Sequence, residues 1–219
     1  MNEQVPLYEQ LQGVVEQFKL QAPQEVLDNL AKSVSDLIEK EQVSGLVVGS
    51  KAPNFTLKDA TGKEVTLSEE VAKGPVILTF YRGGWCPFCN LELQAYKKHM
   101  DTIKEQDAQL IAVSPESPDN SLSSREKHDL PFYVLSDTNS HVSSAYKVAY
   151  EVPEYLAETL KGALGLDLIR YNDADVAMLP VPATYIIDKE GIIQLAFVNP
   201  DYTSRLEPTK AIEVLNNLK

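Results

Sequence analysis

The chain has 219 residues, with 20 Lys plus Arg against 32 Asp plus Glu, so its formal net charge is −12 at pH 7. An acidic balance of this kind repels phosphate backbones and anionic lipids, which argues against binding to nucleic acid or to a membrane surface. No apolar run approaches the ~20 residues of a membrane-spanning helix, and the start, MNEQVPLYEQ, does not resemble an export signal. We therefore expect a cytoplasmic protein, in a reducing compartment where a cysteine pair is more often catalytic than structural.

Two amphipathic segments open the chain and predict two helices. Apolar residues recur at helical spacing over residues 7–18 and again over residues 26–38. Glycines follow soon afterwards, so we place a boundary near residue 44. The sequence thus predicts an N-terminal helical extension over 1–44 and a larger domain over 45–219.

The larger domain alternates strand and helix patterns. In chain order they predict a hairpin turning at 60–62, a buried strand at 76–81, a helix at 87–105, a strand at 108–114, a short helix at 117–129, a strand at 132–137, a helix at 140–148, an antiparallel hairpin with strands at 183–188 and 192–198, and a final helix at 207–219. This order indicates an α/β fold with a mixed central sheet and helices on both faces. Residues 149–180 show no clean period apart from a helix pattern around 153–162, and long connections of this kind are usually functional covers or partner surfaces.

The chain's only two cysteines lie in the stretch YRGGWCPFCN, directly after a predicted buried strand. A strand, a Gly-Gly turn and a helix in succession place Cys86 at a helix N-terminus, where unpaired N–H groups and the helix dipole favour thiolate over thiol. Cysteine pKa values in such positions fall from ~8.5 to ~3.5–7.5. Cys89 lies on the same helical face, and Arg82 could hold a thiolate or an anionic intermediate. The pattern indicates a redox pair.

A metal site is disfavoured by the residue types available. A structural zinc ion needs four Cys or His ligands, and the histidines His99, His128 and His141 are not spaced as a second pair. We expect these histidines at the surface or at helix caps, and we expect neither a metal nor another cofactor.

Four segments together resemble the peroxiredoxin-like branch of the AhpC/TSA (alkyl hydroperoxide reductase/thiol-specific antioxidant) superfamily. They are APNFTLKDATGKEVTLSE, FYRGGWCPFCNLEL, SPESPDNSLSSREKHDLPFYVLSD and VPATYIIDKEGIIQLAFVNPDY. The resemblance covers about residues 45–219. It implies a thioredoxin-like fold, thiol-based antioxidant activity on a peroxide, and re-reduction by thioredoxin or a similar thiol.

The chain departs from true peroxiredoxins at the positions that surround their reactive cysteine. Those enzymes carry Pro-x-x-x-Thr-x-x-Cys after the Phe-Tyr that ends the strand, and an Arg just before the late hairpin. Here the Pro and Thr positions hold Arg82 and Cys86, the cysteine position is Cys89, and the Arg position is Pro182. Trp85 before the pair and Pro182 before the hairpin strand are thioredoxin-like, so we expect both to position substrate, with a cis peptide bond before Pro182.

Two reactions fit this pair. In peroxide reduction, which the resemblance favours, one thiolate forms a sulfenic acid that the other cysteine resolves as a disulfide. The leaving alkoxide then needs hydrogen-bond donors. Arg82 could supply them, and so could Arg205, although we expect Arg205 to be a surface cation. In thiol–disulfide exchange with protein or small-molecule disulfides, which the local motif fits better, Cys86 is the exposed nucleophile and Cys89 the buried resolving thiol.

A third interpretation is a non-catalytic binding module with a redox-sensing disulfide. The N-terminal helices and residues 149–180 offer surface for partners, and a second copy of the chain, forming a homodimer, is one such partner.

Overall fold

The structure is a computed structural model that describes residues 5–59 and 61–218. In this part of the chain the main sheet has seven strands in the order β2-β1-β5-β4-β3-β8-β9. Their bounds are β1 (Thr56–Asp59), β2 (Glu64–Thr66), β3 (Val76–Phe80), β4 (Gln109–Ser114), β5 (Tyr133–Ser136), β8 (Ala183–Ile187) and β9 (Ile193–Val198). Strands β3, β4 and β5 are parallel, whereas β1 and β8 join them antiparallel, so the sheet is mixed and the fold is thioredoxin-like as expected.

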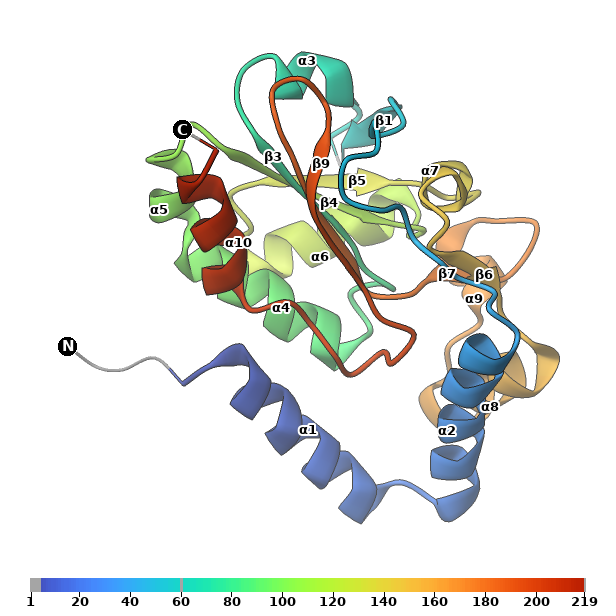
Figure 1. Cartoon of the computed structure of the whole chain (residues 1–219). Coiled ribbons are helices and arrows are strands. Elements are labelled where there is room, and N and C mark those ends of the chain that lie inside the picture. Colours follow the sequence, from blue (N-terminus) through green and yellow to red (C-terminus); the bar gives the residue numbers. More distant parts are fainter. Residues whose placement is uncertain (1–4, 60, 219) are drawn as a thin grey trace.

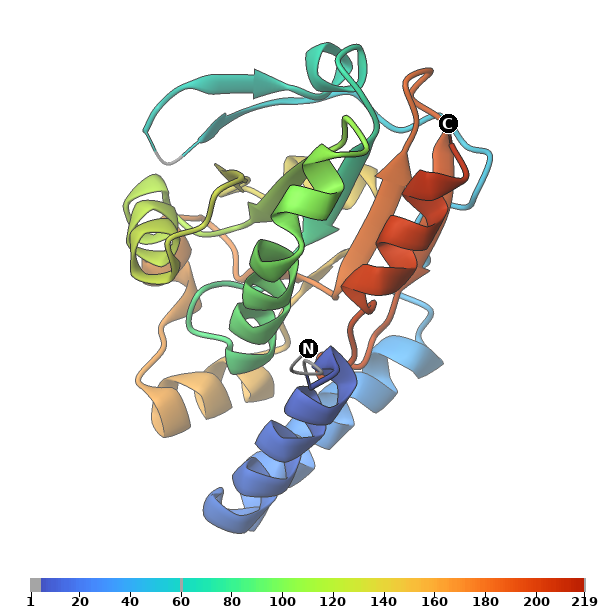
Figure 2. The ribbon, with the colours of Figure 1, turned by 90° about the vertical axis from the view of Figure 1, so that its left-hand side faces the viewer.

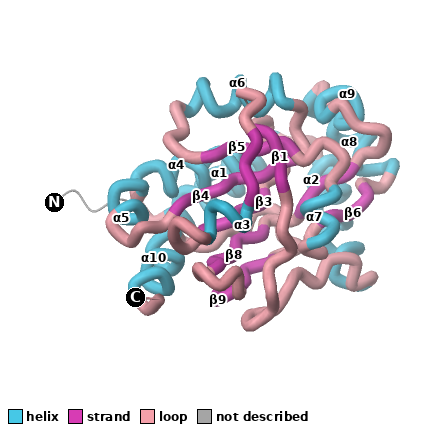
Figure 3. Tube along the Cα trace, turned by 90° about the horizontal axis from the view of Figure 1, so that it is seen from above, coloured by secondary structure: helices cyan, strands magenta, loops and turns pink. Residues whose placement is uncertain are grey.

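Helices lie around the sheet, as the view from above shows (Figure 3). Their bounds are α1 (Leu7–Gln21), α2 (Gln24–Glu39), α3 (Leu67–Val71), α4 (Pro87–Lys98), α5 (Met100–Lys104), α6 (Pro118–His128), α7 (His141–Ala145), α8 (Glu154–Leu164), α9 (Leu168–Asn172) and α10 (Pro208–Asn216). A small second sheet pairs β6 (Ala149–Glu151) with β7 (Met178–Pro180). No helix among the described residues is both long and apolar enough to cross a bilayer.

The alternating side chains of β3 divide the core between the two faces of the sheet. Ile77 packs in a cluster that includes apolar residues of α1, α4, α5 and α10, and α4 and α10 lie on the near face in Figure 2. Leu78 and Phe80 pack in the other cluster, which draws on α2, α7 and α8. All five residues of β3 are buried, as expected for a central strand that is covered on both faces.

The two N-terminal helices pack into the hydrophobic clusters on opposite faces of the sheet. Buried leucines of α1 belong to the α4 side and buried leucines of α2 to the α8 side, so the helical pair wraps around one end of the sheet (Figure 1). At the start of α1 the backbone N–H of Leu7 donates to a carboxylate oxygen of Glu207 at 3.2 Å. On α2, Asn29 donates to the hydroxyl of Thr159 at 2.9 Å. The proposed domain boundary near residue 44 stays a prediction.

The structure confirms most expected elements and corrects two details. The predicted helix over 87–105 is interrupted at His99, where α4 ends and α5 begins. The segment 149–180, which had no clear period, contains the short strands β6 and β7 besides α8 and α9. The hairpin of β1 and β2 is present with antiparallel pairing, although residue 60 of its predicted turn lies outside the described residues.

Candidate active site

The loop between β3 and α4 carries the cysteine pair, and two glycines shape it. Gly83 adopts φ = +147°, and a Cβ added there would meet the Trp85 indole. A Cβ added at Gly84 would meet the hydroxyl of Ser124. Only glycine fits this close approach. The loop delivers Cys86 to the N-cap of α4, with Pro87 in the first turn, as the sequence predicted.

Both cysteines are free thiols and both are buried, with Cys86 1% and Cys89 0% exposed. The expectation that Cys86 is an exposed nucleophile is therefore wrong. Cys86 packs in the same apolar cluster as Phe88, with Leu11 of α1 in that cluster and Tyr202 packed against it. These contacts come from the N-terminal helix and from the chain after β9, so local sequence around the pair gave no sign of them.

The two thiols differ in acidity. Burial raises the pKa of Cys86, but a hydrogen bond from Cys89 and the positive charges of Arg82 and Arg205 outweigh it, and the pKa falls to about 6. Burial raises the pKa of Cys89 well above its usual value, and the hydrogen bond to Cys86 and the Cys86 charge raise it further. These opposite directions favour a thiolate on Cys86 over a thiolate on Cys89.

Arg82 lies buried beside the pair, between two aromatic rings. Its guanidinium carbon is 5.0 Å from the centre of the Trp85 ring and 5.0 Å from that of Tyr202. Tyr150, from β6, lies close to Arg82, and the positive charge of Arg82 opposes the rise in the Tyr150 pKa that burial causes. Cation–π contacts of this kind hold a guanidinium in place, so Trp85 helps to fix the position of Arg82, and its role in positioning substrate stays a prediction.

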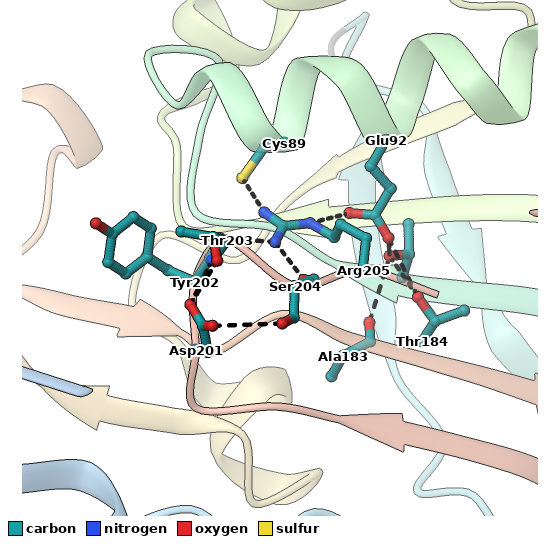
Figure 4. A network of polar contacts seen from close by, with 10 residues as sticks. Cys89, Glu92, Ala183, Thr184, Asp201, Tyr202, Thr203, Ser204 and Arg205 are labelled. Carbon is teal, nitrogen blue, oxygen red and sulfur yellow. Dashed lines mark hydrogen bonds and ion pairs between the residues drawn. The ribbon is translucent and has the colours of Figure 1, made fainter. Parts of the chain in front are cut away.

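The sequence suggested that Arg205 is a surface cation. The structure shows that this is wrong, because the Arg205 side chain is 0% exposed. Its Nη2 donates to Cys89 Sγ at 3.0 Å and its Nε donates to Glu92 Oε2 at 2.6 Å (Figure 4). Its Nη1 donates to the carbonyl oxygens of Tyr202 at 2.8 Å and Ser204 at 2.6 Å. The chain after β9 returns across α4 and brings in this arginine. The Arg position of true peroxiredoxins holds Pro182 here, and Arg205 supplies a guanidinium to Cys89 from another segment.

Sequence reasoning missed two buried carboxylates. Glu92, on the same face of α4 as Cys89, accepts from Arg205 and from the hydroxyls of Thr79 and Thr184 at 3.3 and 3.4 Å. Burial raises its pKa to about 7, although Arg205 opposes the shift. A charged residue on the apolar stripe of α4 was the signal that could have found it.

Glu116 is the second missed carboxylate, and it lies after β4. Its Oε2 accepts from Tyr81 at 3.0 Å and from Ser114 at 3.2 Å. Its Oε1 accepts from the Gly84 N–H at 2.9 Å, from Ser124 at 3.3 Å and from Tyr171 of α9 at 2.9 Å. This carboxylate thus ties the cysteine loop to the segment 149–180, which no local pattern indicated.

Pro182 is buried at the same end of the sheet as the pair, but its peptide bond is trans. The register of β3 and β8 sets Phe80 opposite Ala183, so Pro182 lies across from Tyr81 at the start of the cysteine loop. The expected cis bond is therefore wrong. The backbone from β7 continues extended through Val181, whose N–H donates to the carbonyl of Val148 at 2.9 Å.

The three histidines lie apart from the pair, at helix ends. His128 ends α6, His141 begins α7 and His99 separates α4 from α5. In the described ranges, 5–59 and 61–218, no cluster of three or more His, Cys, Asp or Glu side chains could hold a metal ion.

Comparisons with known proteins agree with this geometry. The AhpC/TSA family pattern matches residues 48–196. Peroxiredoxin Q of Sedum lineare, a chloroplastic protein, is 30% identical over 183 residues, which cover 83% of each chain. Peroxiredoxin Bcp of Bacillus subtilis is 35% identical over 144 residues, 66% of this chain and 80% of the relative.

A crystal structure of the peroxidoxin BcpB of Mycobacterium tuberculosis shares the fold, with a TM-score of 0.62 and 19% identity over 78% of this chain and 97% of that one. Matches to several other chloroplastic relatives span 62–67% of those chains. Because the relatives include chloroplastic and bacterial proteins, the cytoplasmic location stays a prediction. The chain belongs to the AhpC/TSA family, as a peroxiredoxin homologous to peroxiredoxin Q and Bcp.

Proposed function

We propose that the chain reduces peroxides through a cysteine cycle in which Cys86 is the nucleophile and Cys89 the resolving thiol. The observation that carries this assignment is the position of Cys86 at the N-cap of α4, with the positive charges of Arg82 and Arg205 close by. The pKa of Cys86 is lowered to about 6, with Arg82 and Arg205 both contributing, whereas that of Cys89 is raised. The thiolate is the nucleophile in such reactions.

The first step consumes one peroxide. The Cys86 thiolate attacks one peroxide oxygen, the O–O bond breaks, and the electron pair leaves on the alkoxide or hydroxide, which takes a proton. Cys86 is left as a sulfenic acid. The guanidinium of Arg82, held between Trp85 and Tyr202, is placed to stabilise the charge that develops on the leaving oxygen.

The second step closes a disulfide. Cys89 loses its proton and attacks the sulfur of Cys86, so that the S–S bond forms as the S–O bond breaks and water leaves. A dithiol reductant of the thioredoxin type then supplies two electrons and two protons and restores both thiols. Because both sulfurs are buried, peroxide and reductant each require a movement of the loop or of its cover.

The test uses the variants Cys86→Ser and Cys89→Ser with hydrogen peroxide in stopped flow, with sulfenic acid trapped by dimedone and located by mass spectrometry. We expect Cys89→Ser to form sulfenic acid on Cys86 at the wild-type rate, and Cys86→Ser to react slowly. Fast oxidation of Cys89 in the Cys86→Ser protein would reverse the two roles, in accordance with the family's cysteine position. If the wild-type protein reacts no faster than a free thiol of similar pKa, the peroxidase proposal fails.

A second candidate is thiol–disulfide exchange. It is favoured by the N-cap position of Cys86, with its low pKa and a hydrogen bond from the thiol of Cys89. Reduction of insulin disulfides measures it. A mixed disulfide trapped on Cys86 in the Cys89→Ser variant, together with slow peroxide oxidation, would select this reaction.

A further inference from the structure

A groove of about 800 Å³ lies between the two N-terminal helices, the first turn of α4 and residues 201–203. Its walls are largely apolar and come from three segments far apart in the sequence. The apolar lining consists mainly of Val15 and Phe18 of α1, Leu27 and Val34 of α2, and the rings of Phe88 and Tyr202. Its volume lies within the range of roughly 300–1,000 Å³ that is usual for small-molecule sites.

The inner wall of the groove is also the cover of the cysteine pair. Phe88 lies between Cys86 and Cys89 in the sequence, and its ring meets the Tyr202 ring edge-on, with the centres 5.6 Å apart. Tyr202 in turn packs on the guanidinium of Arg82, with 5.0 Å from its ring centre to the guanidinium carbon. A molecule in the groove therefore touches the side chains that shield the thiolate.

The helices that form the outer walls are fixed at their far ends. The first turn of α1 is held by Glu207, which accepts from the N–H of Tyr8 at 2.6 Å. Further along, α2 is held against α8, where the Tyr155 hydroxyl donates to Asp36 at 2.9 Å. The groove lies between these anchors, so the pair of helices does not need to come away for the groove to be filled.

The lining chemistry selects one kind of occupant. Its charged residues include one cation, Lys19, and the anions Asp28 and Asp201, so a strongly charged ligand finds little net attraction in an already acidic protein. Burying apolar ligand surface against apolar walls makes the binding free energy more favourable by roughly 25 cal/mol for each Å² removed from water. Hydrogen peroxide has no such surface to bury, whereas an organic hydroperoxide has.

We propose that this groove is a specificity subsite that binds the apolar body of an organic hydroperoxide and directs its –OOH group to Cys86. The inference rests on the proposed peroxidase function, and it assigns to the N-terminal helices the choice between organic and inorganic peroxide. The reaction at sulfur is the one given above, with the corresponding alcohol as the product.

The test places a charge on the groove wall. Ala31 lines the groove and is exposed, so Ala31→Glu can fold normally, and Ser35→Glu puts the same charge on an exposed position of α2 outside the lining. We expect Ala31→Glu to lower kcat/KM for cumene hydroperoxide by about tenfold, the lower end of the effect of one methylene in an apolar pocket. The kcat/KM of Ala31→Glu for hydrogen peroxide should equal the wild-type value. The kcat/KM of Ser35→Glu should equal the wild-type value for both peroxides.

A binding measurement with the product alcohol, 2-phenyl-2-propanol, provides a readout without chemistry. Trp85 is the only tryptophan of the chain and packs on Arg82, which also packs on Tyr202 of the groove wall, so its fluorescence can respond when the groove is filled. We expect a saturable change in the wild-type and Ser35→Glu proteins that is lost in Ala31→Glu.

The outcomes separate the two claims. If both peroxides react fast and Ala31→Glu slows neither, or slows both equally, the subsite is refuted while the peroxidase stands. Absence of any alcohol-dependent fluorescence change in wild type also overturns the subsite. Slow reaction of wild type with both peroxides defeats the proposed function itself, and the subsite with it.

Discussion

The guanidinium of Arg205 bridges Cys89 and Glu92, with Nη2 3.0 Å from the cysteine sulfur and Nε 2.6 Å from the carboxylate oxygen. The Arg205 and Glu92 side chains are 0% and 1% exposed, so neither charge is hydrated by bulk water. The bridge joins the chain after β9 to α4 next to the redox pair. Its effects on stability and on the thiols can be measured separately.

Removing Arg205 is expected to destabilise the fold strongly. Arg205→Met leaves the Glu92 carboxylate buried without its ion-pair partner, and losses of this kind cost about 3–5 kcal/mol. The free energy of unfolding should be measured with urea at about pH 8, above the Glu92 pKa of about 7, where this carboxylate is ionised. Lys210→Met, which breaks an exposed pair with Glu213, is the control and should cost less than about 1 kcal/mol. A similarly small loss for Arg205→Met would contradict the prediction.

Glu92 is expected to make stability depend on pH. Its pKa in the fold is about 7, raised from the ordinary 4.5 by burial, so the folded state holds a proton that the unfolded chain releases. The stabilisation is thus fully present below about pH 4.5 and is lost as the pH rises through about 7. The unfolding free energy of wild type relative to Glu92→Gln should fall by about 3 kcal/mol over this window, at 1.36 kcal/mol for each unit. A difference that is flat with pH would show that folding does not raise the pKa of Glu92.

Local patterns predicted the elements that position the pair. The continuous apolar run of β3 and the strand–Gly-Gly–helix order located Cys86 at the N-cap of α4, and the structure has it there. Alternating residues around 56–66 predicted the hairpin of β1 and β2. These features depend on residues that are neighbours in sequence, for which period and turn chemistry are informative.

The environment of the pair could not be predicted in the same way. Arg205 reaches Cys89 across 116 positions of sequence, and Glu116 reaches Tyr171 across 55. The burial of Cys86 depends on Leu11 of α1 and on Tyr202. No periodicity links such segments, because their contact is decided by how helices and loops pack at the end of the sheet. The thioredoxin-like motif predicted a cis peptide bond before Pro182, but the bond is trans. The local motif does not determine this geometry, which depends on how the surrounding segments pack.

The acidity of Cys86 is expected to depend on Arg82. Thiolate formation in wild type, followed by its ultraviolet absorbance, should rise with a midpoint at about pH 6. Arg82→Met removes a neighbouring positive charge, so the midpoint should move upward by about 1–3 units. Peroxide oxidation should shift with it, because only the thiolate reacts. Arg170→Met, at an exposed position of α9, is the control and should leave the midpoint in place. An unchanged midpoint in Arg82→Met would assign the low pKa to the hydrogen bond from Cys89 and to Arg205.

Glu116 is expected to hold the cysteine loop in its reactive shape. Its two oxygens accept five hydrogen bonds, including one from the Gly84 N–H, and Glu116→Gln replaces an acceptor by an amide donor that faces donors. Leaving buried donors unpaired costs about 1–3 kcal/mol in unfolding free energy. Tyr171→Phe removes only one of the five bonds and should cost about 0.5–1.5 kcal/mol. If the carboxylate positions the loop, Glu116→Gln also slows the oxidation of Cys86 at a pH well above its pKa, where the thiolate is fully formed. A variant that loses stability but oxidises at the wild-type rate would limit Glu116 to holding α9 against the sheet.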